Sequence, residues 1–245
     1  MKQPATTEPE RRGRGRPAAG QNVSLTPEFV IGVALELCRS EPLQDVSVVR
    51  LARELKVTAS LVHYYMGGRD ALTTGVMNRF YGELVSRLPS HTGDWRADLT
   101  AVARTVYRGY VKYPGVVSYI MSHNRFRLLQ DVKPGETDFG IVFFDRMVSC
   151  VRQVGLDGPR TAMFTHLLLQ HLLASAYQQT SRQLPGDHHD FLIERLQTQD
   201  ERERPNLHFV LDSFARLSGD QAFEAGLAVL IHGIEYAASV PTATR

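Results

Sequence analysis

The sequence has few cysteines and lacks any long apolar run. Its two cysteines, Cys38 and Cys150, both fall within apolar stretches of helical pattern, which argues against a disulfide framework and against a cysteine metal site. No run approaches the roughly 18 apolar residues that a membrane span needs. The polar, arginine-rich start also lacks the apolar core of an export signal. These absences favour a cytoplasmic protein with no membrane partner.

Motifs of the common enzyme classes are missing as well. The chain contains no HExxH, GxSxG, P-loop or GxGxxG pattern. His166 and His171 are five residues apart, so they do not share a helix face as a metal-binding i, i+4 pair would. We therefore expect no catalytic residue, no metal site and no cofactor. A helical enzyme remains an alternative, but it would need a convergent acid–base or metal cluster.

Charge is unevenly distributed. The formal net charge is +2, which alone is weak support for a nucleic-acid partner. Residues 1–20 carry an excess of +3, whereas residues 21–69 are balanced. Residues 1–22 are also rich in Arg, Gly and Pro and lack apolar periodicity, so we expect a disordered basic tail there.

Apolar residues elsewhere recur at helical spacing, and no segment alternates as a strand does. The pattern predicts an all-α chain of about nine or ten helices. Residues 185–205 read as a mobile loop with at most one helical turn. The clearest later segments expected to be helical are 69–88, 94–112, 114–129, 139–154, 159–184, 207–217 and 220–238.

The stretch LARELKVTASLVHYYMGGRDAL (51–72) predicts a helix, a tight turn at Lys56-Val57 and a second short helix that Thr58 caps. We expect Leu61 and Val62 to fold back on the preceding helix. The polar face that remains outward would suit the second helix of a helix-turn-helix, which lies in the DNA major groove.

These motifs resemble the DNA-binding domain of the tetracycline-repressor (TetR) family. The family pattern L-A-x-x-L, G-V, a short S/T-x-x-x-L-Y-x-H/Y-F helix and K/R-D-A-L has counterparts from Leu51 to Leu72, and residues 25–40 resemble the family's first helix. One departure is Lys56, which stands where the family usually has Gly at a site that often needs positive φ. The resemblance implies a three-helix DNA-binding domain at 23–68 and a larger helical regulatory and dimerisation domain at 69–245.

The resemblance implies which residues approach double-stranded DNA. Side chains of Ser, Thr, His and Tyr mainly hold phosphates, and Arg50 is better placed than Arg53 to reach a base edge or the backbone. Individually, several of these residues would also fit the surface or core of a helical bundle. The DNA-binding set in the helical head is Ser47, Arg50, Thr58, Ala59, Ser60, His63, Tyr64, Tyr65 and Arg69.

The tail adds the motif GRGRP at 13–17, which resembles an AT-hook core. Glycine lets a backbone approach the narrow minor groove, and Arg14 and Arg16 would follow its negative floor. A solubilising tail is the alternative, but the position just upstream of a helix-turn-helix favours a minor-groove arm.

The closing segment, DQAFEAGLAVLIHGIE (220–235), resembles the last helix of TetR-type regulatory domains. Gly226 and Gly233 would allow another helix to approach closely, as in dimer contacts. We expect a homodimer in which residues 159–184 and 220–238 form a four-helix interface, so that two heads read a palindromic operator.

Aromatic and polar residues of the larger domain could line an effector cavity. Each one would also fit plain core, but the set suits a small-molecule site, which has apolar walls and a few polar groups. The position of the histidine that helps tetracycline-binding members hold the drug's magnesium corresponds to Ile120, which argues against a tetracycline–metal ligand. The expected ligand-binding residues are Tyr107, Tyr110, Tyr119, His123, Phe126, Met163, His166 and Gln170.

The sequence therefore predicts a transcriptional repressor that a small-molecule ligand releases from a palindromic operator. An architectural DNA-binding protein that uses only the tail and head is the second alternative. Ligand binding would shift the population toward a conformation whose heads no longer fit adjacent major grooves.

Overall fold

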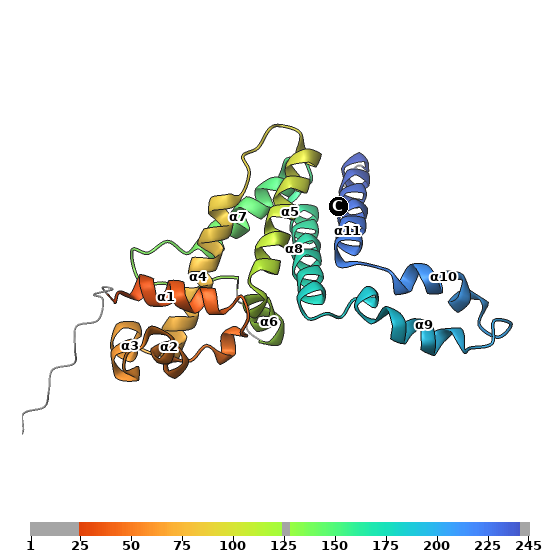
Figure 1. The fold of residues 1–245 in the computed structure, drawn as a ribbon. Helices are drawn as coiled ribbons and strands as arrows, with labels where there is room; N and C mark the ends of the chain where they lie inside the picture. The colour runs from red at the N-terminus through yellow and green to blue at the C-terminus, as the bar shows by residue number, and fades with distance from the viewer. Residues whose placement is uncertain (1–24, 124–127, 241–245) are drawn as a thin grey trace, which may run out of the picture.

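The structure, a computed structural model, describes residues 25–123 and 128–240. The described residues form helices, turns and loops and contain no strand, so the all-α prediction is confirmed. A small N-terminal head lies at one end, and a larger helical domain lies beside it (Figure 1). One long helix, α4, runs from the first into the second.

The head consists of three short helices: α1 (Pro27–Leu37), α2 (Val48–Leu55) and α3 (Ala59–Met66), with a 3-10 turn η1 (Leu43–Asp45) after α1. Thr26 caps α1 by accepting a hydrogen bond from the Phe29 N–H at 3.2 Å, and Pro27 occupies the first turn, where it removes no helical hydrogen bond. The core of the head is formed by Val30, Ala34, Leu35, Cys38, Leu51, Ala52, Val62 and Met66.

Helix α4 (Arg69–Arg87) belongs to the cores of both parts. Its N-terminal half packs on α1 and α3, and its C-terminal half packs on α5 and α7. Gly75 permits the close approach to α1, because a Cβ there would lie 2.6 Å from the Ile31 side chain. Buried side chains therefore continue along α4 from Leu72 to Leu84 without a polar break between the two parts.

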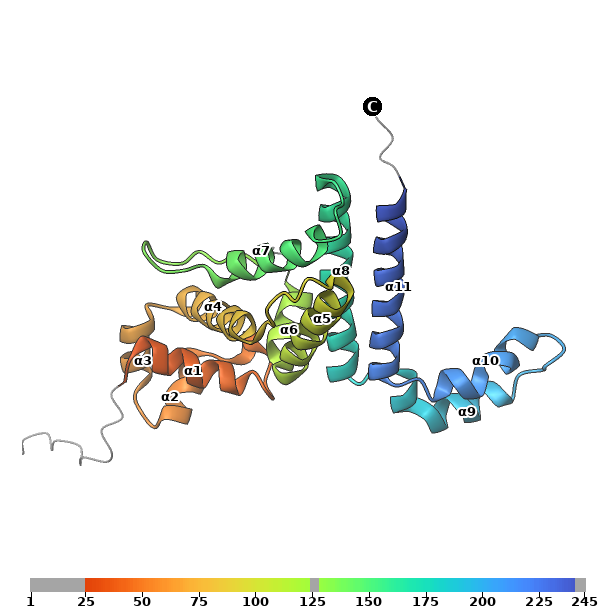
Figure 2. The same cartoon turned by 90° about the horizontal axis from the view of Figure 1, so that it is seen from above.

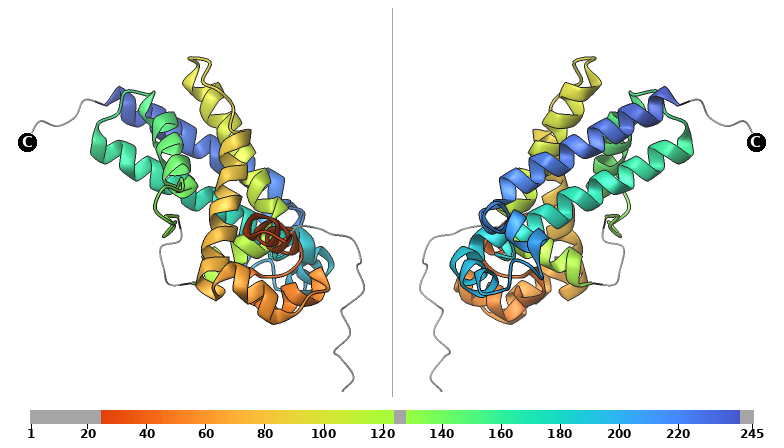
Figure 3. Two further views of the ribbon diagram at one scale, coloured as in Figure 1. Left: turned by 90° about the vertical axis from the view of Figure 1, so that its left-hand side faces the viewer. Right: turned by 90° about the vertical axis from the view of Figure 1, so that its right-hand side faces the viewer.

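The larger domain is built around α8 (Gly158–Thr180). Helices α5 (Trp95–Lys112), α6 (Pro114–Ser122), α7 (Phe139–Arg152) and α11 (Gly219–Ser239) all pack against it. Asp94 caps α5 by accepting N–H bonds from Arg96 and Ala97. Figures 2 and 3 show α8 and α11 running side by side along one face of the domain.

Residues 185–217 form a projecting helical hairpin. The expectation of a mobile loop at 185–205 was wrong, because η2 (Pro185–His188) and α9 (His189–Gln197) are helical and α10 (Pro205–Ala215) returns beside α9. The hairpin extends away from the bundle (Figures 1 and 2). Helix α9 contains no fully buried residue, and its apolar residues Leu192, Ile193 and Leu196 are half-buried.

Gly226 and Gly233 of α11 differ in their surroundings. A Cβ on Gly226 would lie 2.3 Å from the His171 ring on α8, whereas a Cβ on Gly233 would meet only Phe164 at 3.6 Å. The close approach at Gly226 is therefore to a helix of the same chain. A close approach of either glycine to a helix of a second chain stays a prediction.

Candidate DNA-binding and effector sites

The turn between α2 and α3 fixes the direction in which α3 leaves the head. Lys56 ends α2 in the left-handed region, with φ 55° and ψ 40°, a conformation that costs a residue with a Cβ about 1–2 kcal/mol. The Val57 N–H donates to the Ala52 carbonyl at 3.0 Å and closes the turn. The positive φ that the family places on glycine is thus kept here with lysine.

Two hydroxyls predicted to contact DNA act as helix caps. Ser47 Oγ accepts the Arg50 N–H at 3.1 Å at the start of α2, and Thr58 Oγ1 accepts the Leu61 N–H at 3.3 Å at the start of α3. A hydroxyl that accepts one bond still has its own proton to donate. Contact of Ser47 and Thr58 with a phosphate therefore stays a prediction.

Helix α3 has one buried edge and one solvent face. Val62 and Met66 are buried, while Tyr64 is 79% exposed. Leu61 was expected to fold back with Val62, but it lies 40% exposed on the outer side. That expectation was wrong, because the buried positions of this short helix follow an i, i+4 line that excludes position 61. The remaining predicted positions are exposed at Ser60 and His63 and half-buried at Ala59 and Tyr65.

The two arginines of the head that are predicted to contact DNA, Arg50 and Arg69, are held by groups within the head. Arg50 Nη2 lies 2.7 Å from Glu41 Oε1, and its Nη1 lies 2.8 Å from Glu54 Oε2. Arg69 donates to the Gln44 carbonyl. These bonds stabilise the turn that precedes α2 and leave each guanidinium fewer N–H groups to donate to DNA. Arg50 is therefore a poorer candidate than its position in the sequence indicated.

The predicted minor-groove arginines, Arg14 and Arg16, lie outside the described residues.

A cavity of about 410 Å³ lies between α8 and the helices packed on it. Tyr81 and Tyr110 line it as buried residues, while His166 and Gln170, one turn apart on α8, lie exposed at its edge. The volume falls within the usual range of small-molecule sites. Its lining residues are Tyr81, Tyr110, Ile120, Leu128, Phe144, Ala162, His166, Leu169, Gln170 and Leu173.

The structure brings only part of the predicted ligand set together. Tyr110, His166 and Gln170 line this cavity, whereas Tyr107 lies in a separate hollow and stacks on Phe223 with ring centroids 4.0 Å apart.

The other predicted ligand residues do not line the cavity. Tyr119 stacks on His123, whose Nδ1 lies 3.0 Å from the Tyr119 carbonyl oxygen. Met163 is exposed on α8, and Phe126 lies outside the described residues.

Sequence reasoning missed Tyr81, Phe144, Leu169 and Leu173, which also line the cavity. For Tyr81 the signal was present, since it continues the buried line of α4 with an aromatic side chain. Ile120, the counterpart of the magnesium-holding histidine, lies in the cavity wall and presents an aliphatic side chain there.

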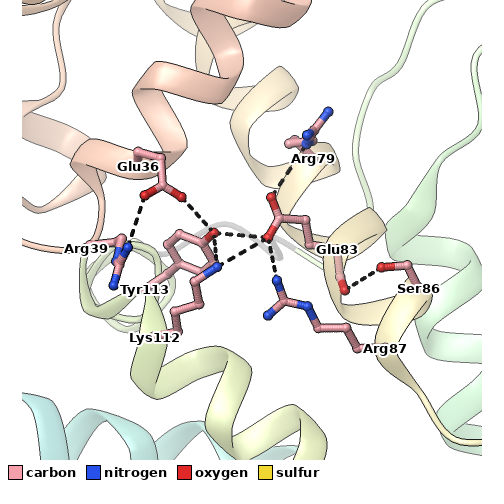
Figure 4. Close-up of polar contacts among 8 residues, drawn as sticks. All are labelled: Glu36, Arg39, Arg79, Glu83, Ser86, Arg87, Lys112 and Tyr113. Carbon is pink, nitrogen blue, oxygen red and sulfur yellow. Dashed lines mark hydrogen bonds and ion pairs between the residues drawn. The ribbon is translucent and has the colours of Figure 1, made fainter.

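A polar cluster joins the head to the larger domain (Figure 4). The Tyr113 hydroxyl, at the junction of α5 and α6, lies 3.0 Å from Glu83 Oε2 on α4 and 3.2 Å from Glu36 Oε1 on α1. Lys112 Nζ donates to the same hydroxyl at 2.8 Å. Burial, followed by the neighbouring Glu83, raises the pKa of Tyr113, so the phenol keeps its proton at neutral pH.

A second contact joins the same two parts. The Gly115 N–H at the start of α6 donates to the Cys38 carbonyl oxygen at the end of α1, at 2.8 Å. A Cβ on Gly115 would lie 1.9 Å from the Glu41 carbonyl oxygen, so only glycine fits there. Helix α6 therefore contacts the turn at Cys38 and Glu41. The Glu41 side chain in turn binds Arg50 on α2, which links α6 to α2.

The outer face of α8 and α11 carries exposed apolar side chains. Met163 and Leu167 lie on α8, and Val229 and Tyr236 lie on α11, each between 38% and 72% exposed. The right-hand panel of Figure 3 shows both helices along this face. Isolated exposed apolar residues are common, but a continuous group indicates an interaction surface.

Within residues 25–123 and 128–240, no three His, Cys, Asp or Glu side chains are grouped so as to hold a metal ion. Over the same ranges, no helix combines the length and apolarity of a membrane span.

The family described as "Tetracyclin repressor-like, C-terminal domain" matches residues 88–238, which is more than half of the chain. The chain belongs to the TetR family. The solved structures agree: apo ActR from Streptomyces coelicolor superposes with a TM-score of 0.72 at 25% identity, over 89% of this chain and 98% of that one. The TetR-family fold of helix-turn-helix head and helical regulatory domain is thereby confirmed.

One further relative and a second ActR structure bear on what such a TetR-family chain does. The HTH-type transcriptional repressor DrrR1 of Streptomyces coeruleorubidus is 25% identical over 177 residues, covering 70% of this chain but only 61% of the relative. ActR has also been solved in complex with actinorhodin, and that structure matches with a TM-score of 0.71 at 26% identity, over 89% of this chain and 100% of that one. The chain thus spans less than two thirds of the length of DrrR1.

Proposed function

We propose that the protein is a homodimeric transcriptional repressor that binds a palindromic DNA operator through α3 and leaves it when a small molecule fills the cavity between α4 and α8. The relationship to a repressor such as DrrR1 supports the DNA-binding role. ActR, whose structures include complexes with (S)-DNPA and actinorhodin, supports the binding of a small-molecule ligand.

The observation that carries this proposal is the double role of α4. Tyr81 on α4 forms part of the cavity wall, and two turns earlier Gly75 packs against Ile31 of α1. A ligand that displaces Tyr81 would therefore act on the helix that supports the head. The Tyr113 cluster and the Gly115 contact add a second connection through α6.

Ligand binding would release DNA only through a difference in affinity between two conformations. If the ligand prefers a conformation with altered head spacing, DNA affinity falls by the ratio of its two affinities. A ligand that binds both conformations equally would leave DNA binding unchanged.

Dimerisation would use the outer face of α8 and α11. A second copy related by a two-fold axis would cover Met163, Leu167, Val229 and Tyr236 on both chains, and such an interface repeats each contact twice. The α9–α10 hairpin, in which Phe209 is 88% exposed, would gain cover from the same partner. Two α3 helices would then face successive major grooves.

At the DNA, Ser60, His63 and Tyr64 would meet phosphates and base edges, helped by Thr58 at the start of α3. Because residues 21–69 are balanced in charge, the tail with Arg14 and Arg16 would supply much of the salt-dependent attraction.

The experiment that tests this proposal starts from DNA selected by the purified full-length protein out of random duplexes. The selected sites should be palindromic, and binding is then measured by fluorescence anisotropy. His63→Ala combined with Tyr64→Ala should lower affinity more than about tenfold, or 1.4 kcal/mol. Both side chains are largely exposed, so the fold should survive.

A matched control replaces Glu201 and Arg202, exposed residues in the loop between α9 and α10, by alanine. This variant should bind as the wild type does. Equal affinity of wild type and the His63/Tyr64 variant would show that α3 is not the reading helix.

A further inference from the structure

The cavity wall has a polar centre at its buried end. Tyr81 and Tyr110 come from α4 and α5, and both are buried. Burial raises the pKa of both phenols, so both keep their protons. Each phenol can therefore donate a hydrogen bond to an acceptor that reaches it.

The surroundings of this pair are aromatic and aliphatic. The Phe80 ring lies 5.4 Å from Tyr81 and 5.6 Å from Tyr110, and Phe143 lies 5.2 Å from Tyr81. Both phenylalanines are fully buried behind the wall, and Phe144, Ile120, Leu169 and Leu173 line the cavity beside the two tyrosines. The rings of Tyr81, Tyr110 and Phe144 can accommodate a planar aromatic group through offset or edge contacts.

Charge at this end of the cavity is unfavourable to an anion. Among the described residues that line it, none is Asp, Glu, Lys or Arg. The Asp138 carboxylate contributes to the raised pKa of Tyr81, and it accepts backbone N–H bonds from Gln130 and Gly140 at 2.9 and 2.8 Å. An anionic group beside the phenols would lose its hydration and would also meet this negative charge.

We propose that the buried end of the cavity binds the uncharged, planar aromatic part of a ligand and that a carbonyl or hydroxyl oxygen on that ring system accepts a hydrogen bond from the Tyr81–Tyr110 pair. The polar part of such a ligand would lie toward His166 and Gln170 at the exposed edge. This inference rests on the proposed effector role of the cavity and specifies the class of molecule that it takes.

Three probes that share one ring system test the proposal. Fluorene, 9-fluorenone and fluorene-9-carboxylate carry CH₂, C=O and a carboxylate at the same ring position. Their binding to the full-length protein is measured by displacement of N-phenyl-1-naphthylamine, an uncharged fluorescent probe. Ala162→Phe, which fills the cavity, should abolish the signal and thereby locate it.

Tyr110→Phe is the diagnostic variant, because it keeps the ring and removes one hydroxyl. It should lower the affinity for 9-fluorenone by about fivefold to tenfold and that for fluorene by less than about twofold. Tyr81→Phe should act in the same way. Tyr107→Phe, on the same helix as Tyr110 but in the separate hollow, should change neither affinity, and fluorene-9-carboxylate should bind the wild type most weakly.

Equal losses for fluorene and 9-fluorenone in Tyr110→Phe, or tightest binding of the carboxylate, would overturn the assignment while leaving an effector role for the cavity intact. DNA affinity with and without 9-fluorenone is measured separately. Binding in the expected order with unchanged DNA affinity would support the ligand class and would show that 9-fluorenone binds both conformations equally.

Discussion

The polar cluster around Tyr113 should couple the head to the regulatory domain energetically. The perturbation is a double-mutant cycle between Glu36→Gln on α1 and Tyr113→Phe at the junction of α5 and α6. Neither change alters the size of the side chain substantially. If the hydrogen bond seen between these groups contributes to stability, the two changes together should cost less than the sum of the single changes.

The magnitude follows from the geometry. A hydrogen bond to a charged group contributes about 1.5–3 kcal/mol. The Tyr113 phenol has a single proton and two carboxylates in reach, Glu83 at 3.0 Å and Glu36 at 3.2 Å. Since the shorter bond goes to Glu83, only part of the interaction belongs to Glu36. We expect a coupling free energy of about 0.5–1.5 kcal/mol for the Glu36–Tyr113 pair.

The assay is chemical unfolding followed by circular dichroism, at one fixed protein concentration because association would change the apparent stability. The control cycle pairs Glu36→Gln with Tyr107→Phe, a buried tyrosine of α5 whose hydroxyl bonds to Asp220 instead, at 3.4 Å. That pair should be additive within about 0.5 kcal/mol. The same additivity for Glu36 and Tyr113 would mean that the cluster does not connect the two parts.

Three further changes test other parts of the structure. Gly226→Ala should lower the melting temperature, because the new Cβ would lie 2.3 Å from the His171 ring. Gly233→Ala, whose Cβ would lie 3.6 Å from Phe164, should raise the melting temperature through up to about 1 kcal/mol of helix propensity. The opposite ranking would contradict the packing described. Hydrogen bonds from Thr92 lower the pKa of Asp98, so the ionised carboxylate stabilises the fold above its ordinary pKa of about 3.9, and this stabilisation is lost as the pH falls through the lower folded pKa. Asp98→Asn should therefore lower the melting temperature at pH 7, by an amount that shrinks below about pH 4. A difference in melting temperature that stays constant with pH would contradict this. Deleting residues 1–20 should flatten the dependence of log affinity on log salt by roughly 2–3.5 while the palindrome preference persists, and an unchanged slope would show that the tail makes no phosphate contact.

Helices with clear end signals could be predicted from the sequence. Asp94 and Pro114 bound α5 because one caps its start and the other begins the next helix. The hairpin was missed although Leu192, Ile193 and Leu196 follow helical spacing in α9, because they lie among charged and polar residues and are only half-buried. Leu61 shows a further limit, since neighbouring apolar residues on a short helix point in directions about 100° apart.

The cavity was harder to predict than the helices. Inward aromatic residues occur on α4, α5 and α6 alike, and their spacing does not say which of them leave space between them. Tyr107 and Tyr110 are three residues apart on one helix, yet they line different hollows. That separation depends on which helix covers each face, which is a property of the packing rather than of the local sequence.

The distribution of charge in the chain indicates that long-range attraction to DNA and recognition of its sequence depend on different segments. Arg50 and Arg69 hold the turn before α2 together, so in the proposed complex the α3 face would meet DNA mainly with hydroxyl, imidazole and phenol groups. Such groups bind over short distances and depend on the position of the helix. Recognition would then be sensitive to small movements of α4 and α6, while long-range attraction would fall to the basic tail. This division explains how a ligand remote from α3 could remove specific binding and still leave a salt-dependent affinity for DNA.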